Sequence, residues 1–218
     1  MEPFSRQFKI VAVDLAGHGD SGRNRERWTI QSYGDDVAAV VKKPNLKRVI
    51  LIGRSMGGDV ISEAALRLPG RHGPDLGGCL QEVRNRPILR RSASICCEVK
   101  SKFPRSNSRP RSKHVRKHVG PCPRGTVALV MSSAPPNIAQ PSADAAFSYS
   151  REMPRTLERV QLPVIAINPE NAPTDVASLE HYGVQVIFMP GVGHFLMMED
   201  PQRFNSLLST AIGRLNRE

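Results

Sequence analysis

Apolar and polar positions alternate along the chain in two spacings, one typical of buried strands and one typical of helices. Short apolar runs predict strands at Lys9–Asp14, from Lys47 onward, at Leu162–Asn168 and at Val184–Pro190. Apolar residues at helical spacing predict helices over Thr29–Lys43, Met56–Leu68, Ser142–Thr156 and Thr174–Tyr182, and a last helix from Asp200 onward. Strands that alternate with helices in this way form parallel sheets with right-handed crossovers, so the pattern predicts an α/β fold.

The predicted helices begin and end at residues that suit helix ends. Thr29 and Thr174 can cap their helices, Gly183 can close one, and Asp200-Pro201 combines a good cap with a proline that the first helical position tolerates. The last helix has the apolar face of a helix packed on a sheet, formed by Phe204, Leu207, Leu208, Ala211, Ile212 and Leu215.

This alternation stops between Arg71 and Thr126, where apolar residues are sparse and follow neither period. That block holds 14 basic and 3 acidic residues and all four cysteines, and it accounts for the whole net charge of +11. Its composition buries too little apolar surface to offset the entropy lost on ordering, so we expect disorder there. The chain therefore divides into residues 1–70, a basic segment at 71–126, and residues 127–218.

The basic segment could in principle bind nucleic acid or a metal ion. Its charge would give weak, salt-sensitive and non-specific contacts with nucleic acid, without an aromatic platform beyond the single Phe103. Its cysteines also fit no tetrahedral zinc site, because Cys96 and Cys97 are adjacent and the pair His114 and His118 lies far from any Cys-x2-Cys spacing. We expect no metal and no specific nucleic-acid partner.

The strongest chemical motif lies where an apolar strand runs into a helix. The residues Gly53-Arg54-Ser55-Met56-Gly57 form Gly-x-Ser-x-Gly directly after Val49–Ile52. A serine on a tight strand-to-helix turn projects its hydroxyl outward, and glycines on either side allow the strand and helix to approach closely. The amide of Met56, at the start of the helix, is directed to where an oxyanion would develop.

A second candidate, His18, lies in the glycine-rich loop that follows the first predicted strand. Loops at the carboxyl ends of parallel strands face ligands, so this histidine could act in catalysis. Ordering of the loop by hydrogen bonding is the interpretation we favour.

Three motifs together resemble the α/β-hydrolase superfamily: DLAGHGDSG at Asp14–Gly22, GRSMGG at Gly53–Gly58 and GVGHFLMMEDPQRFN at Gly191–Asn205. The resemblance implies a partial α/β-hydrolase fold, a mainly parallel sheet with flanking helices. It also implies that Ser55 is a nucleophile and His194 a general base in an enzyme that cleaves a small ester or related acyl substrate through an acyl-enzyme. It implies no metal and no organic cofactor.

The acid of the triad has two candidates, since the family places it just after the strand at Val164–Asn168. Glu170 lies two residues past that strand, whereas Asp175 lies in the first turn of a predicted helix, where an acidic residue needs no catalytic reason. We favour Glu170. Carbon–carbon bond hydrolysis and cofactor-free haloperoxidase chemistry remain alternative activities of the same site.

The chain also departs from the family's pattern in two places. The family has three strands before Lys9–Asp14, and a loop after the third carries the second oxyanion amide. It also has a strand and a helical cap where Arg71–Thr126 stands. We expect a truncated or frame-disrupted chain, so a catalytically impaired remnant is the alternative to an active hydrolase. The edge of the strand at Lys9–Asp14 would then be open to aggregation or dimerisation, and the sequence does not determine the oligomeric state.

Targeting signals and membrane spans are not evident in the sequence. The first residues are polar, the run Ile10–Val13 is too short for a signal peptide, and no segment has the roughly 18 consecutive apolar residues of a membrane span. A cytoplasmic location is expected.

Overall fold

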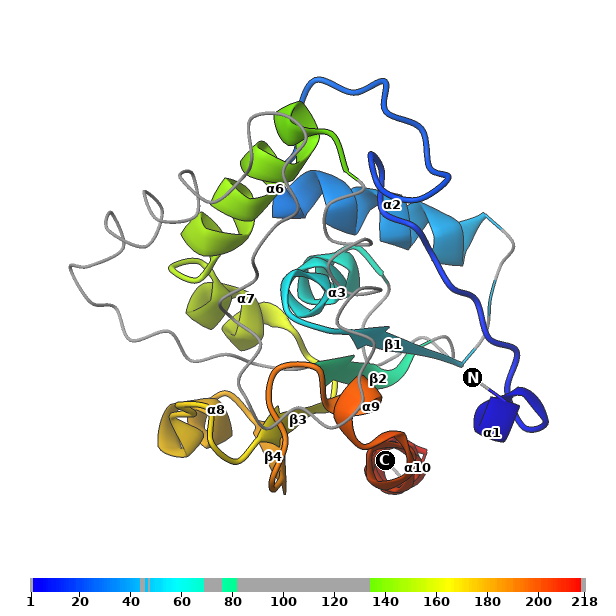
Figure 1. Ribbon diagram of the computed structural model, residues 1–218, viewed down its shortest axis with the longest axis vertical. Coiled ribbons are helices and arrows are strands. Elements are labelled where there is room, and N and C mark those ends of the chain that lie inside the picture. Colours follow the sequence, from blue (N-terminus) through cyan, green and yellow to red (C-terminus); the bar gives the residue numbers. More distant parts are fainter. Residues whose placement is uncertain (1, 44–45, 47, 69–75, 82–133, 217–218) are drawn as a thin grey trace.

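Four parallel strands form the centre of the fold in the computed structural model, which describes residues 2–43, 46, 48–68, 76–81 and 134–216. The strands are β1 (Val49–Gly53), β2 (Leu76–Gln81), β3 (Val164–Pro169) and β4 (Val184–Met189), and their spatial order is β1-β2-β3-β4 (Figure 1). The predicted α/β class is confirmed.

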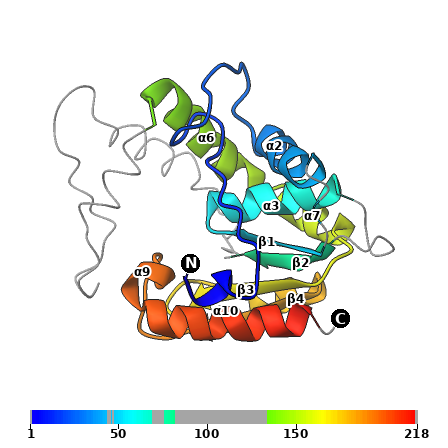
Figure 2. The same cartoon turned by 90° about the vertical axis from the view of Figure 1, so that its right-hand side faces the viewer.

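Helices cover both faces of this sheet, as Figure 2 shows with the sheet between α3 and α10. One face carries α3 (Met56–Leu66), on which pack α2 (Ile30–Lys42), α6 (Pro136–Tyr149) and α7 (Met153–Arg159). The other face carries α10 (Pro201–Leu215), preceded by the short α9 (Leu196–Glu199). The remaining described helices are α1 (Glu2–Ser5) and α8 (Val176–His181).

Strand β3 joins the two hydrophobic cores, because its side chains point alternately to opposite faces. Val164 and Ala166 belong to the core under α2 and α3, whereas Ile165 and Ile167 belong to the core under α10. Every residue of β3 is buried. This explains why the strand reads as a continuous apolar run rather than as an alternating one.

The best predicted helices, α2 and α10, begin where their caps indicate. Thr29 accepts a hydrogen bond from the Ser32 amide, and the Ser32 hydroxyl accepts one from the Thr29 amide. Asp200 accepts a hydrogen bond from the Arg203 amide, with Pro201 in the first helical position. The apolar face predicted for α10 lies in the second core, with Leu208, Ala211, Ile212 and Leu215 buried and Phe204 and Leu207 partly buried.

The first correction concerns the basic segment, which we expected to contain no strand. Its residues Leu76–Gln81 form β2, paired in parallel with β1 on one side and β3 on the other. The two glycines in this segment interrupt any periodic pattern of apolar residues. The segment forms a strand because it pairs with strands on both sides, although its own residues have low strand propensity. Residues 82–126 lie outside the described residues, and with them the expected disorder, the histidines and cysteines weighed as zinc ligands, and the basic surface.

The second correction concerns Lys9–Asp14, which was predicted to be a strand. The segment has no regular structure, and Ile10, Val11 and Val13 are 40–49% exposed. The sheet ends at β1, and no described strand lies beside residues 9–14 to complete a ladder of backbone hydrogen bonds. The edge strands of the described sheet are therefore β1 and β4.

Two predicted helices have different bounds in the structure. The helix expected over Ser142–Thr156 is two helices, α6 and α7, separated by a turn at residues 150–152. Pro136 is the first residue of α6 and Pro135 is its N-cap residue. A proline in the first turn is tolerated because it lacks only an amide that has no helical partner. The helix expected to be capped by Thr174 begins one residue later, with Asp175 as its cap.

A polar cluster that is buried at Tyr149, Thr156 and Glu63 connects α6 and α7 to α3. The Tyr149 hydroxyl donates to Glu63 Oε1 at 2.7 Å and lies 2.8 Å from the Thr156 hydroxyl, while Arg67 pairs with Glu63 and Asp35. Burial, with the neighbouring Glu63 carboxylate, raises the pKa of Tyr149 above its ordinary value. Burial lowers the pKa of Arg67, but the hydrogen bonds that it donates to Glu63 and Asp35, together with their negative charges, outweigh that effect and raise the pKa overall. The phenol and the guanidinium therefore keep their protons and remain donors.

Candidate functional site

The candidate nucleophile, base and acids follow the carboxyl ends of parallel strands. Ser55 follows β1, Glu170 and Asp175 follow β3, and His194 follows β4. Because parallel strands end at the same edge of a sheet, the topology brings these segments to one rim, where ligands bind in open α/β sheets.

Ser55 has the strained backbone of a sharp strand-to-helix turn. Its φ and ψ angles are 54° and −121°, a region that residues other than glycine rarely adopt. The residue stands at the N-cap position of α3, yet its side chain makes no capping hydrogen bond. Serine in this position ordinarily caps the helix, whereas the Ser55 hydroxyl does not.

The two glycines of the motif differ in whether a Cβ atom would fit at their position. A Cβ atom on Gly53 would lie 2.1 Å from the Gly57 carbonyl oxygen, so the strand and the helix are in backbone contact there. A Cβ on Gly57 would meet nothing within 4 Å. The expectation that glycine permits close approach is confirmed for Gly53 and is wrong for Gly57.

The amide of Met56 lies at the first position of α3, next to Ser55. The amides of Gly57 and Gly58 donate to the carbonyls of Arg54 and Ser55 at 2.8 and 2.9 Å. No backbone carbonyl in the described part of the chain accepts a hydrogen bond from the Met56 amide. An amide in the first turn of a helix has no partner within that helix, which suits it to bind a negative charge.

His194 lies on the loop between β4 and α9, in which Gly191 has a φ of +76°. The rings of His194 and Phe195 meet edge to face, with their centroids 5.2 Å apart. The Glu199 carboxylate accepts hydrogen bonds from the Gly193 amide at 2.6 Å and from the Phe195 amide at 3.2 Å. It therefore holds the backbone on both sides of the histidine.

Arg54 connects the serine turn to the histidine loop. Its Nε donates to the His194 carbonyl oxygen at 3.2 Å, and its guanidinium carbon lies 4.1 Å from the centroid of the Phe195 ring. Residues 54 and 194 are thus in direct contact although 140 residues separate them in the sequence. Arg54 and Glu199 were not among the sequence-predicted site residues.

The two candidate acids differ in their surroundings. Glu170 is exposed, comes directly after β3, and donates its backbone amide to the Met189 carbonyl at 3.2 Å. Asp175 accepts hydrogen bonds from the Ser178 amide at 3.1 Å and the Ser178 hydroxyl at 2.6 Å, as the cap of α8. Both lie on the segment that joins β3 to α8, at the same rim as the serine turn.

His18 lies in the loop predicted to be ordered by its own hydrogen bonds. Its Nδ1 lies 3.1 Å from the Ala16 carbonyl oxygen, and its ring packs edge to face on Tyr33, with a centroid distance of 6.3 Å. The favoured interpretation, that His18 orders this loop, is confirmed by these contacts.

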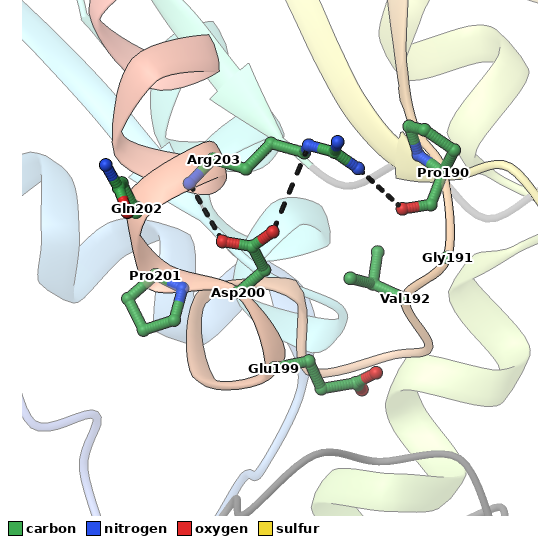
Figure 3. A pocket seen from close by; sticks show the side chains of 8 residues that line it. All are labelled: Pro190, Gly191, Val192, Glu199, Asp200, Pro201, Gln202 and Arg203. Atoms are coloured by element: carbon green, nitrogen blue, oxygen red, sulfur yellow. Dashed lines mark hydrogen bonds and ion pairs between the residues drawn. The ribbon is translucent and has the colours of Figure 1, made fainter.

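An open hollow lies beside the histidine loop, between the end of β4 and the start of α10 (Figure 3). The Arg203 side chain extends across this hollow and donates a hydrogen bond to the Pro190 carbonyl oxygen at 3.3 Å. Its Nε also lies 3.9 Å from Oδ2 of Asp200. Glu199 lines the same hollow, with its side chain extending toward the loop that carries Val192.

Within the described residues, no group of three or more histidine, cysteine, aspartate or glutamate side chains is placed to hold a metal ion. No helix in these ranges is long and apolar enough to span a bilayer.

Comparisons with curated proteins find similarity in short segments. A putative esterase/lipase of Haemophilus influenzae is 46% identical over 55 residues, which cover 25% of this chain and 19% of that protein. An AB hydrolase superfamily protein of Bacillus subtilis is 40% identical over 67 residues, which cover 31% of this chain and 24% of that protein. The chain thus matches about a fifth to a quarter of the length of these relatives.

Solved structures share the fold over nearly the whole chain. A hydrolase from Oleispira antarctica superposes with a TM-score of 0.77 and 18% identity, covering 97% of this chain and 84% of that one. An N-acyl homoserine lactone degrading enzyme gives a TM-score of 0.62 and 22% identity, covering 90% of this chain and 80% of that one. At these identities the likeness concerns the fold.

The family model described as "Alpha/beta hydrolase family" matches residues 2–207, which include the strained serine turn, the four strands and the histidine loop. The chain belongs to the alpha/beta hydrolase family.

Proposed function

We propose that this protein is a serine hydrolase that cleaves an ester or a related acyl substrate through an acyl-enzyme. Ser55 is the nucleophile, His194 the general base, and the Met56 amide a donor to the oxyanion. The observation that carries the proposal is the contact of Arg54 with the His194 carbonyl, which joins the strained serine turn to the histidine loop.

The proposed reaction has two half-reactions with the same proton carrier. His194 takes the proton of the Ser55 hydroxyl as its oxygen attacks the acyl carbonyl, and the negative oxygen that forms binds the Met56 amide. Collapse breaks the bond to the leaving group, which receives the proton from His194. Water then attacks the acyl-serine with His194 again as base, and the acid is released with Ser55 restored.

The carboxylate that orients His194 is proposed to be Glu170 or Asp175. Both follow β3, next to the strand that leads into the histidine loop. In a triad the carboxylate stabilises the imidazolium and fixes the ring's tautomer. Separate Glu170→Ala and Asp175→Ala variants assign the role, since the acid is the one whose loss lowers kcat.

The substrate class follows from the nucleophile and from the relatives. A serine that forms an acyl-enzyme acts on carbonyl compounds with a leaving group. The Haemophilus influenzae relative is named a putative esterase/lipase. A small uncharged ester is therefore the substrate class that we propose for the first assays.

Burst kinetics test the proposal with p-nitrophenyl acetate. We expect a rapid release of nitrophenolate, of about one equivalent per enzyme, followed by slower turnover, because deacylation of such esters limits the steady state. The Ser209→Ala variant, which changes an exposed serine on α10, is expected to keep the burst. Folded protein that releases nitrophenolate no faster than buffer would contradict the proposal and favour a catalytically impaired remnant.

A further inference from the structure

The Glu199 carboxylate binds the backbone on both sides of His194. Oε2 accepts from the Gly193 amide at 2.6 Å, and Oε1 accepts from the Phe195 amide at 3.2 Å. A Cβ atom built on Gly193 would lie 3.1 Å from Oε1, so the carboxylate also packs closely on that residue. A single side chain thus binds the amides of the residues directly before and after the histidine.

Other contacts restrain the same loop at different points. Arg54 donates to the His194 carbonyl, and Arg203 donates to the Pro190 carbonyl at the start of the loop. These two cations bind carbonyl oxygens, whereas Glu199 binds amides. Loss of the carboxylate would therefore leave two amides without their acceptor, in a loop that is otherwise held by the Arg54 and Arg203 hydrogen bonds to carbonyl oxygens, by the Arg54 contact with the Phe195 ring and by burial of Val192.

We propose that Glu199 is a positioning residue that holds His194 in the orientation required for proton transfer with Ser55. The inference rests on the proposed function, because it assigns Glu199 a role through the catalytic histidine. Hydrogen bonds from amides to an ionised carboxylate are stronger than those between neutral groups. The imidazole must lie within hydrogen-bond distance of the serine oxygen, so small rotations of the loop lower the rate.

The test compares Glu199→Ala and Glu199→Gln with the wild type in p-nitrophenyl acetate hydrolysis. Glu199→Ala removes both acceptors, and we expect kcat to fall about 10- to 100-fold while KM changes less than about twofold, since misplacement by about 1 Å has effects of this size. Glu199→Gln keeps one oxygen acceptor, so its kcat is expected to fall less than that of Glu199→Ala. Glu158→Ala, which changes an exposed glutamate on α7, serves as the matched control.

Added formate gives a readout that a general loss of structure would not produce. Glu199 lines the open hollow of Figure 3, so a small carboxylate can enter from solvent and accept from the same two amides. We expect formate to restore part of kcat in Glu199→Ala and to leave Glu158→Ala and the wild type unchanged. An unchanged kcat in Glu199→Ala would overturn the inference, as would a loss that formate does not relieve.

Amide hydrogen exchange separates this inference from the proposed function. In the wild type the amides of Gly193 and Phe195 are expected to exchange slowly, and in Glu199→Ala at least about tenfold faster, with formate slowing them again. If the wild type shows slow exchange but no turnover, the proposed function fails while the loop restraint stands. If turnover is present and both amides exchange equally in wild type and Glu199→Ala, the positioning role fails alone.

Discussion

Ser55→Ala is expected to lower kcat for ester hydrolysis by about 10⁴- to 10⁶-fold, since a nucleophile and its base act as one unit in such sites. The variant keeps the backbone turn and removes only the hydroxyl oxygen that would carry the acyl group. Steady-state kinetics with p-nitrophenyl acetate measure the effect, and circular dichroism and the melting temperature show whether the fold is unchanged.

The double variant Ser55→Ala, His194→Ala makes this prediction more specific. We expect it to be about as slow as either single variant, because once the nucleophile is absent the base has no proton to accept. If the fold decreases in kcat of the two single variants multiplied in the double variant, the two residues would act separately. Such a result would contradict a shared role in catalysis.

Gly53→Ala is expected to have the largest effect on stability, about 3 kcal/mol or more, at the upper end of the cost of overpacking. The added Cβ would stand 2.1 Å from the Gly57 carbonyl oxygen and 2.8 Å from the Gly58 nitrogen. These are backbone atoms and cannot rotate away, so β1 and α3 would have to separate. Urea denaturation followed by circular dichroism measures the change in the free energy of unfolding.

Gly57→Ala is the matched control for that substitution. Its Cβ would meet nothing within 4 Å, and alanine has a higher helix propensity than glycine by up to about 1 kcal/mol. We expect unchanged or slightly raised stability. Equal destabilisation by the two substitutions would show that the contact between Gly53 and the helix is not what makes glycine necessary there.

Helices and strands that are specified by their own residues could be predicted from the sequence. The helices α2 and α10 combine a cap with an apolar face, and the structure has both at the expected places. Strand β2 could not be predicted, because its Leu-Gly-Gly-Cys sequence carries no pattern and its strand form comes from β1 and β3. For the same reason Lys9–Asp14 was wrongly predicted, since a strand-like sequence without a neighbouring strand forms no ladder.

Those residues of the candidate site that lie in recognisable motifs could be predicted from the sequence. The strained Ser55 follows from Gly-x-Ser-x-Gly between an apolar strand and a helix, and the location of His194 follows from its place after β4. Arg54 and Glu199 were missed because the hydrogen bonds described for them are to backbone atoms, which leave no pattern in the sequence. The signals available in hindsight are an arginine inside the serine motif and a glutamate just before the Asp-Pro start of α10.

The most direct test of the central claim is to locate the residue that a fluorophosphonate modifies. The probe transfers its phosphonyl group to an activated serine and releases fluoride, and tandem mass spectrometry of the digested protein identifies the modified side chain. We predict one adduct per folded chain, on Ser55, absent from Ser55→Ala and strongly slowed in His194→Ala. An adduct on another serine, or folded protein that takes up no phosphonate, would contradict the proposal that Ser55 and His194 form a working nucleophile and base.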